Sequence, residues 1–313
     1  MTPRGENAQP GSDSHPAGSA DSADSTDSAD STDSTDSADY RRPHYQPGIP
    51  AVIDVPDAPL SELLETAARF YGERCAVDFL GATLTYAELL EASERAAQLL
   101  RESGVEAGDR VSVIMPNCPQ HMVAVYGALR LGAIVAEHNP LAPSREVRAQ
   151  LDHHGARVVI VWEKGIDLVL DPASTAAGGP DPAVDPLSGR TVFSVDLSAA
   201  MPVRLRAALH LPVARARRMR ASMKADVLPA GVLSWDREVS RASRLPASWP
   251  HPRGSDIAVL LHTGGTTGTP KAAMLSHTNL RANVNQAIAW VPMLHEGAET
   301  FLALLPFFHA FGL

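Results

Sequence analysis

The sequence has few cysteines and no long apolar run. Its two cysteines, Cys75 and Cys118, lie in neither a CxxC motif nor a His/Cys cluster, which argues against a disulfide framework or a structural zinc site. The most apolar stretch, Met122 to Ala136, contains Arg130 and is too short to span a bilayer. The N-terminus lacks the apolar segment of a secretory signal. We therefore predict a cytoplasmic protein in a reducing compartment.

Outside its N-terminus the chain also lacks a charge excess. The formal net charge is −9, but residues 1–40 alone carry −8, because they contain one basic residue, Arg4, and nine acidic ones. The remaining 27 acidic and 26 basic residues almost cancel. A broad basic surface for nucleic acid is therefore absent, and we predict no nucleic-acid partner.

Residues 1–44 have the composition of a disordered acidic tail. Aspartate recurs at every third position from Asp21 to Asp39, and no large aliphatic or aromatic residue occurs between Met1 and Tyr40. Such a segment cannot bury enough apolar surface to offset its ordering entropy. A solvating extension and an acidic interaction arm are both open interpretations.

From residue 45 the pattern favours an α/β fold in which apolar runs alternate with helical periodicity. Helices are predicted at 60–71, 86–103, 119–131, 144–154 (capped by Ser144) and 277–290, and strands at 75–80, 110–115, 133–136, 157–162, 257–261, 272–275 and 301–305. Strands that alternate with helices at this spacing predict βαβ-type parallel sheets with flanking helices.

The region from about 165 to 250 departs from this alternation and reads as an insertion. It begins with a Pro/Gly-rich stretch, Pro172 to Gly189, and continues with Met201 to Lys224, which holds seven basic residues and no acidic one. One interpretation is a basic amphipathic hairpin at the inner face of the cell membrane. The other is a helical pair with a solvated arginine face.

The most informative stretch follows the predicted strand at 257–261. The loop from Thr263 to Lys271 contains three glycines, four threonines and one of only three lysines in the chain. Backbone amides, hydroxyls and one ammonium suit phosphate oxygens. Pro270 and Ala272 on either side of the lysine exclude a Walker A loop, and the apolar run after the loop excludes a dinucleotide fingerprint.

Two other features invite a chemical interpretation that we do not favour. His153 and His154 are adjacent, so on a helix they point in different directions, and no carboxylate or cysteine completes a metal site with them. Cys118 has no identifiable base partner, so we expect a small buried or loop residue and not a nucleophile.

Several motifs together resemble the adenylate-forming superfamily of acyl-CoA synthetases, adenylation domains and luciferases. They are the phosphate-loop signature Thr263–Lys271 and the segments Leu84–Leu89, Leu129–Leu141 and Leu305–Gly312. The resemblance covers about residues 45–313 and is strongest to bacterial long-chain fatty-acid–CoA ligases. It implies an incomplete N-terminal, AMP-binding domain over 45–313.

The resemblance implies a two-step reaction in which a fatty acid and ATP give an acyl-adenylate, and CoA then displaces AMP. Lys271, Thr263 and His309 would be catalytic, and Thr263 would lie near Mg²⁺. ATP phosphates would be bound by Thr263, Gly264, Gly265, Thr266, Thr267, Gly268, Thr269 and Lys271. The acyl group would contact Phe308, His309, Phe311 and Gly312. Ordinary core packing is an equal explanation for the two aromatic residues. A homodimer and a peripheral membrane contact stay open.

The sequence also departs from the superfamily pattern. Ala272 replaces the usual glycine after the loop lysine, and the adenine-site motif, the ribose-binding aspartate, the hinge and the C-terminal lysine are not found. We therefore expect a truncated protein that is inactive alone. Alternatives are an aryl- or medium-chain acid–CoA ligase, an acyl-AMP ligase and, from another class, a non-catalytic fragment or interaction protein.

Overall fold

A mixed seven-stranded sheet forms the centre of the protein, seen here in a computed structural model that describes residues 45, 48–170, 185, 187–225, 227–263 and 271–313. Its strand order is β7 (Leu233–Ser234), β6 (Thr191–Val195), β5 (Val158–Trp162), β3 (Arg110–Ile114), β4 (Ile134–Glu137), β8 (Ile257–Thr263) and β9 (Lys271–Ser276). All neighbouring pairs are parallel except β8 with β9. A separate antiparallel hairpin joins β1 (Cys75–Phe79) to β2 (Ala82–Thr85). The predicted α/β class is confirmed.

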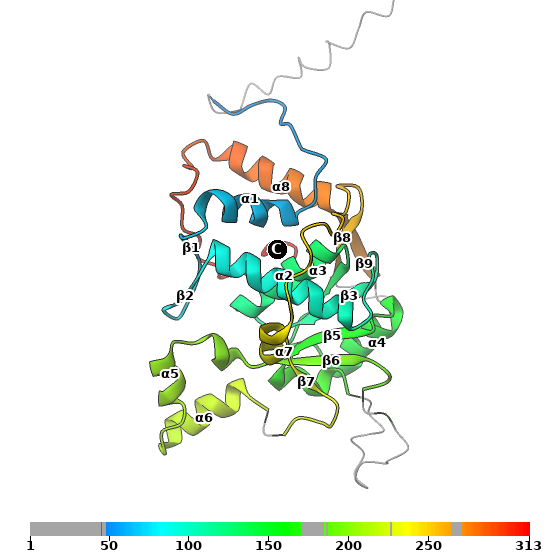
Figure 1. Cartoon of the computed structure of the whole chain (residues 1–313), viewed down its shortest axis with the longest axis vertical. Helices are drawn as coiled ribbons and strands as arrows, with labels where there is room; N and C mark the ends of the chain where they lie inside the picture. The colour runs from blue at the N-terminus through cyan, green and yellow to red at the C-terminus, as the bar shows by residue number, and fades with distance from the viewer. Residues whose placement is uncertain (1–44, 46–47, 171–184, 186, 226, 264–270) are drawn as a thin grey trace, which may run out of the picture. The chain divides into compact units, whose positions relative to one another are not determined.

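Both faces of this sheet are buried, as expected for parallel strands. Along β5, Val158 and Ile160 point into one apolar core and Val159 and Val161 into the other. The first core is completed by α1 (Ser61–Tyr71), α2 (Tyr86–Glu102), α3 (Pro119–Leu131) and α7 (Trp235–Arg241), and the second by α4 (Ser144–His154) and the 3-10 helix η2 (Glu163–Leu168). We call the side of the sheet covered by α3 the α3 face and the side covered by α4 the α4 face (Figure 1).

Local signals set the helix ends. Thr85 accepts a hydrogen bond from the Glu88 amide while the Glu88 carboxylate accepts one from the Thr85 amide, so α2 begins with a capping box. Ser276 and Asn279 form the same arrangement at the start of α8 (His277–Trp290). Helix α3 ends at Gly132, whose φ of 87° favours glycine. One predicted cap is wrong: α4 begins at Ser144, but Pro143 occupies the N-cap and no side chain caps the helix.

Helix α8 lies beside α1, although the two are far apart in sequence (Figure 1). The ring nitrogen Nδ1 of His277 accepts a hydrogen bond from the Leu60 amide at 3.0 Å. The Arg281 guanidinium donates to the Pro59 carbonyl at 2.9 Å and pairs with Glu62 at 3.0 Å. These contacts fix α8 against the N-terminal end of α1.

The region predicted to be an insertion also supplies strands β6 and β7, for which the sequence analysis assigned none. Its basic part forms two short helices, α5 (Val203–Ala208) and α6 (Ala214–Met223), whose arginines are mostly exposed. Exposed arginines fit both interpretations of this segment, so a peripheral membrane contact stays a prediction. None of the helices within the described ranges has the length and apolarity to cross a bilayer.

The strand predicted at Phe301–Leu305 is wrong, because the segment pairs with no other strand of the described structure. Its apolar composition suggested burial, yet Phe301 is 79% exposed and Leu302 85%. Hydrogen bonds from the side chain of Asn117 to its carbonyl groups take the place of a strand ladder.

Helices α2 and α3 pack closely at Gly127. A Cβ atom there would lie 2.7 Å from Ala96 Cβ, 3.0 Å from the Ser93 carbonyl oxygen and 3.1 Å from the Ala97 amide nitrogen. These distances are shorter than ordinary van der Waals contact, so the helix pair requires a residue without a side chain at this position.

We therefore predict that Gly127→Ala lowers the free energy of unfolding. Alanine gains about 1 kcal/mol of helix propensity over glycine, but overpacking a tight core costs about 1–3 kcal/mol, and here the nearest atoms include backbone. Urea unfolding should show a net loss of about 1 kcal/mol or more, partly recovered when Ala96→Gly is added. A more stable Gly127→Ala protein would contradict the close packing.

Candidate functional site

Strands β8 and β9 hold the two described ends of the predicted phosphate loop together. Thr263, the last residue of β8, is the cross-strand partner of Lys271, the first residue of β9. The Thr263 hydroxyl donates to the Lys271 carbonyl at 3.4 Å, and both residues are exposed. The structure thus brings together two of the residues predicted to bind phosphate. The others, Gly264, Gly265, Thr266, Thr267, Gly268 and Thr269, lie outside the described residues.

A largely apolar cavity of about 400 Å³ lies on the α3 face, beside these strands. Its volume is within the usual range for a small-molecule site. The wall combines residues of α1, α3, β8, β9 and α8 with the C-terminal segment 307–313. The aliphatic lining residues are Leu60, Leu63, Met122, Val125, Leu129, Leu261, Leu275, Leu280, Val284 and Leu313.

One end of the cavity carries a buried histidine–carboxylate pair. His121 Nε2 lies 2.8 Å from Glu137 Oε1, and both side chains are at most 1% exposed. The ring of Phe307 meets His121 edge-on, with ring centroids 5.4 Å apart. Nδ1 of His121 and Oε2 of Glu137 have no hydrogen-bond partner in the part of the chain that the structure describes. His121 is therefore a polar residue of the cavity wall, together with Tyr126, Asn279 and Asn283.

Asn117 anchors the segment that closes this cavity. Its side-chain amide donates to the carbonyls of Ala303 at 3.0 Å and Leu305 at 2.7 Å, and its oxygen accepts from the Phe307 amide at 2.9 Å. One side chain thus ties the end of β3 to a segment more than 180 residues away. No local pattern in the sequence marks Asn117 or His121, because the partners of Asn117 lie more than 180 residues away and that of His121 is on the neighbouring strand β4.

The residues predicted to contact the acyl group occupy different positions. Gly312 lies in the cavity wall, together with Phe307 and Ala310. Phe308 is half-buried but does not line the cavity, and Phe311 is 82% exposed. Gly312 is tightly enclosed, since a Cβ atom there would lie 2.1 Å from the Pro306 carbonyl oxygen.

His309 is exposed, and its hydrogen bonds within the described structure are local. Its amide donates to the Pro306 carbonyl at 3.1 Å, and its Nδ1 accepts from the Phe311 amide at 3.4 Å. The roles assigned to His309, Phe308 and Phe311 stay predictions.

Cys118 is not arranged as a nucleophile. It precedes α3, is 4% exposed, and its sulfur lies 3.7 Å from that of Met115. Burial raises the pKa of the thiol to about 12, so it is protonated at neutral pH. The expectation of a small buried residue is confirmed.

We predict that Asn117→Ala loosens the segment that closes the cavity. Each lost hydrogen bond is worth about 1 kcal/mol, so exchange of the Phe307 amide hydrogen, which Asn117 accepts, should accelerate about 5–30-fold. Asn285→Ala is the matched control, because Asn285 also donates its side-chain amide to a backbone carbonyl, that of Asp54. Equal exchange of the Phe307 amide in both variants would contradict the anchoring role.

Comparison with known proteins agrees with this architecture. Residues 64–313 match the family model described as AMP-binding enzyme. The long-chain-fatty-acid–CoA ligase of Bacillus subtilis is 31% identical over 86% of this chain and 45% of its own length. The enzyme of the same name from Salmonella typhimurium is 33% identical over 86% of this chain and 46% of its own length. The chain thus spans a little under half the length of these curated relatives.

Solved structures show the same fold. A long-chain-fatty-acid-CoA ligase from Archaeoglobus fulgidus superposes with a TM-score of 0.59 at 22% identity, over 85% of this chain and 46% of that one. The MbtA protein of Mycobacterium smegmatis gives a TM-score of 0.53 at 26% identity, over 72% of this chain and 35% of that one. With the family model matched along most of its length, the chain belongs to the AMP-binding enzyme family.

Proposed function

We propose that this chain is the phosphate- and acid-binding part of an AMP-forming acid–CoA ligase whose substrate is a long-chain fatty acid. The acid reacts with ATP to give an acyl-adenylate and pyrophosphate, and the thiol of CoA then displaces AMP. The names of the relatives at 31–33% identity support this assignment.

The observation that carries the proposal is the double role of β8. Leu261 contributes to the wall of the apolar cavity, and Thr263, two residues further along the same strand, stands at the base of the predicted phosphate loop. An acid whose chain fills the cavity would therefore be held beside the segment predicted to bind ATP. Such placement of two reactants is a large part of the catalysis of a two-substrate reaction.

The composition of the loop fits the first half-reaction. A carboxylate that attacks the α-phosphate of ATP brings two anions together, so the reaction needs neutralisation of charge more than covalent help. In our proposal Lys271, with the threonine hydroxyls and glycine amides of the loop, binds the departing pyrophosphate. ATP would bind as its Mg²⁺ complex, and the exposed Thr263 hydroxyl is an oxygen ligand of the kind that Mg²⁺ accepts. His309 would lie beside the carboxylate.

The cavity lining favours an aliphatic acid over an aromatic one. Its wall consists mostly of leucine, valine and methionine side chains, and each buried methylene group contributes about 0.8 kcal/mol. A longer alkyl chain therefore gains more from this cavity than a short or aryl acid does. The aryl- or medium-chain ligase is the alternative that the same experiment distinguishes.

The test is ATP–pyrophosphate exchange by the complete gene product with palmitate, octanoate and benzoate. We expect exchange that depends on added acid and is fastest with palmitate. Exchange fastest with benzoate or octanoate would select the alternative ligases, and no exchange with any carboxylic acid would overturn the ligase assignment.

In the same assay Lys271→Ala should slow exchange about 100-fold, the usual effect of removing one group that stabilises charge in the transition state. Lys164→Ala is the matched control, because Lys164 is exposed on η2 and plays no part in the proposed site. Undiminished exchange in Lys271→Ala would remove the role given to this lysine.

A further inference from the structure

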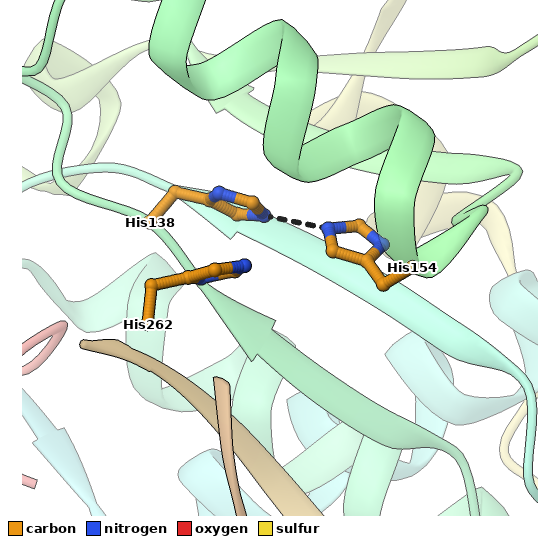
Figure 2. Close-up of side chains that lie close together, drawn as sticks. All are labelled: His138, His154 and His262. Atoms are coloured by element: carbon orange, nitrogen blue, oxygen red, sulfur yellow. Dashed lines mark hydrogen bonds between the residues drawn. The ribbon is translucent and has the colours of Figure 1, made fainter. Parts of the chain in front are cut away.

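Three histidines from distant parts of the sequence meet on the α4 face of the sheet. His138 follows β4, His154 is the last residue of α4, and His262 is the next-to-last residue of β8 (Figure 2). Each offers one ring nitrogen, and these nitrogens all lie within 4.8 Å of one another. Within the described ranges no other group of three or more His, Cys, Asp or Glu side chains has this geometry.

The sheet itself creates this cluster. Glu137 and Leu261 are partners across the parallel β4–β8 ladder, and both point toward the α3 face, where Leu261 lines the cavity and Glu137 holds His121. His138 follows Glu137, and His262 follows Leu261. Both histidines point to the opposite face, because side chains alternate along an extended backbone. The cluster is therefore separate from the cavity.

Hydrogen bonds orient two of the rings with a lone pair toward the centre. His138 Nδ1 lies 2.8 Å from the side-chain oxygen of Gln150, and His262 Nδ1 lies 3.0 Å from the Glu137 carbonyl. Both partners are acceptors, so Nδ1 carries the proton in each ring and Nε2 is left as the donor of a lone pair. Metal-binding histidines are usually oriented by an acceptor of this kind on the ring nitrogen that does not bind the metal.

The Nε2 atom of His262 is buried and has no hydrogen-bond partner among the described residues. Buried polar atoms normally have one, so an orphaned lone pair aimed into a group of imidazoles needs an explanation. The Ser112 hydroxyl lies 3.2 Å from Nε2 of His138 and is not a hydrogen-bond partner of His262 Nε2.

His154 completes the group. Its Nε2 lies 3.1 Å from His138 Nε2, and its Nδ1 accepts from the Ala156 amide at 3.2 Å. Without a metal, His154 therefore donates its Nε2 proton to His138. A cation in that place would require the His154 proton on Nδ1 instead, so the Ala156 hydrogen bond would be given up. No proton is gained or lost.

We propose that His138, His154 and His262 bind one divalent transition-metal ion of the Zn²⁺, Co²⁺ or Ni²⁺ class through their Nε2 atoms. Imidazole nitrogens are preferred ligands of these ions. Zn–N bonds of about 2.0–2.1 Å place neighbouring tetrahedral ligands about 3.3 Å apart, close to the 3.1 Å between His138 and His154. A small rotation brings in the third ring, and water takes the fourth position.

At neutral pH a cation would not have to displace protons from these three rings. Burial lowers the pKa of all three histidines, for His154 to about 3, so the rings are unprotonated at neutral pH. The ion would also join β4, α4 and the end of β8, next to Thr263, where the predicted phosphate loop begins. The site stands on these contacts alone and does not depend on the ligase activity.

The test is titration of the untagged, metal-free chain with Co²⁺, whose visible absorption reports tetrahedral imidazole ligands, followed by Zn²⁺ competition and metal analysis after dialysis. We expect one ion per chain, bound at least 10-fold more weakly in His262→Gln and in His154→Gln. His153→Gln is the matched control, because His153 is the exposed neighbour of His154 on the same helix, and it should bind as the wild type does.

Circular dichroism and urea unfolding check that each variant is folded, and a rise of the wild-type melting temperature with added Zn²⁺ gives a second readout. Binding that is unchanged in His262→Gln and His154→Gln would overturn the proposal, as would the absence of a tetrahedral Co²⁺ spectrum. In either case the cluster would be a hydrogen-bonded histidine group that holds no ion.

Discussion

The parallel pairing of β4 with β8 determines which face of the sheet carries each side chain of the candidate site that these two strands supply. Its register sets Glu137 opposite Leu261 and directs both toward the α3 face. A slip of one residue would exchange the two faces of β8. Leu261 would then leave the cavity wall, and His262 would enter it. The close packing of buried side chains on both sides of the sheet keeps this register, because a slip would exchange side chains of different size between the two cores.

Because of this pairing, the two faces of the sheet carry different kinds of side chain. The α3 face holds the apolar cavity, closed by the segment that Asn117 anchors and bordered by the His121–Glu137 pair. The α4 face holds the three histidines. Thr263 continues β8 into the predicted phosphate loop, so one strand contributes to the cavity, to the histidine cluster and to the loop base. A change at the end of β8 would therefore be transmitted to all three.

Features that depend on neighbouring residues could be predicted from the sequence. The helices predicted at 86–103, 119–131 and 277–290, the alternation of helices and strands, and the return of β9 into the sheet are all set within a few residues. The order of loop residues, together with the scarcity of lysine, was also sufficient to identify the phosphate-loop pattern and exclude two commoner ones.

Features that depend on distant residues could not be predicted from the sequence. Asn117 reaches carbonyls more than 180 positions away, and His138 meets His154 and His262 only because β4, α4 and β8 converge. The strand predicted at Phe301–Leu305 failed for the same reason, since an apolar run forms a strand only where a partner strand is available. Conversely, β6 was overlooked inside a region whose overall composition resembles a loop.

We propose that the cavity on the α3 face binds the acyl chain and that the loop between Thr263 and Lys271 binds the β- and γ-phosphates of ATP, so that the carboxylate meets the α-phosphate between them. A crystal structure with palmitate and a non-hydrolysable ATP analogue tests this placement most directly. We expect the alkyl chain between α3 and α8, in contact with Leu261 and Phe307, with the β- and γ-phosphate oxygens next to Thr263 and Lys271. An alkyl chain bound elsewhere, with the cavity empty, would contradict it.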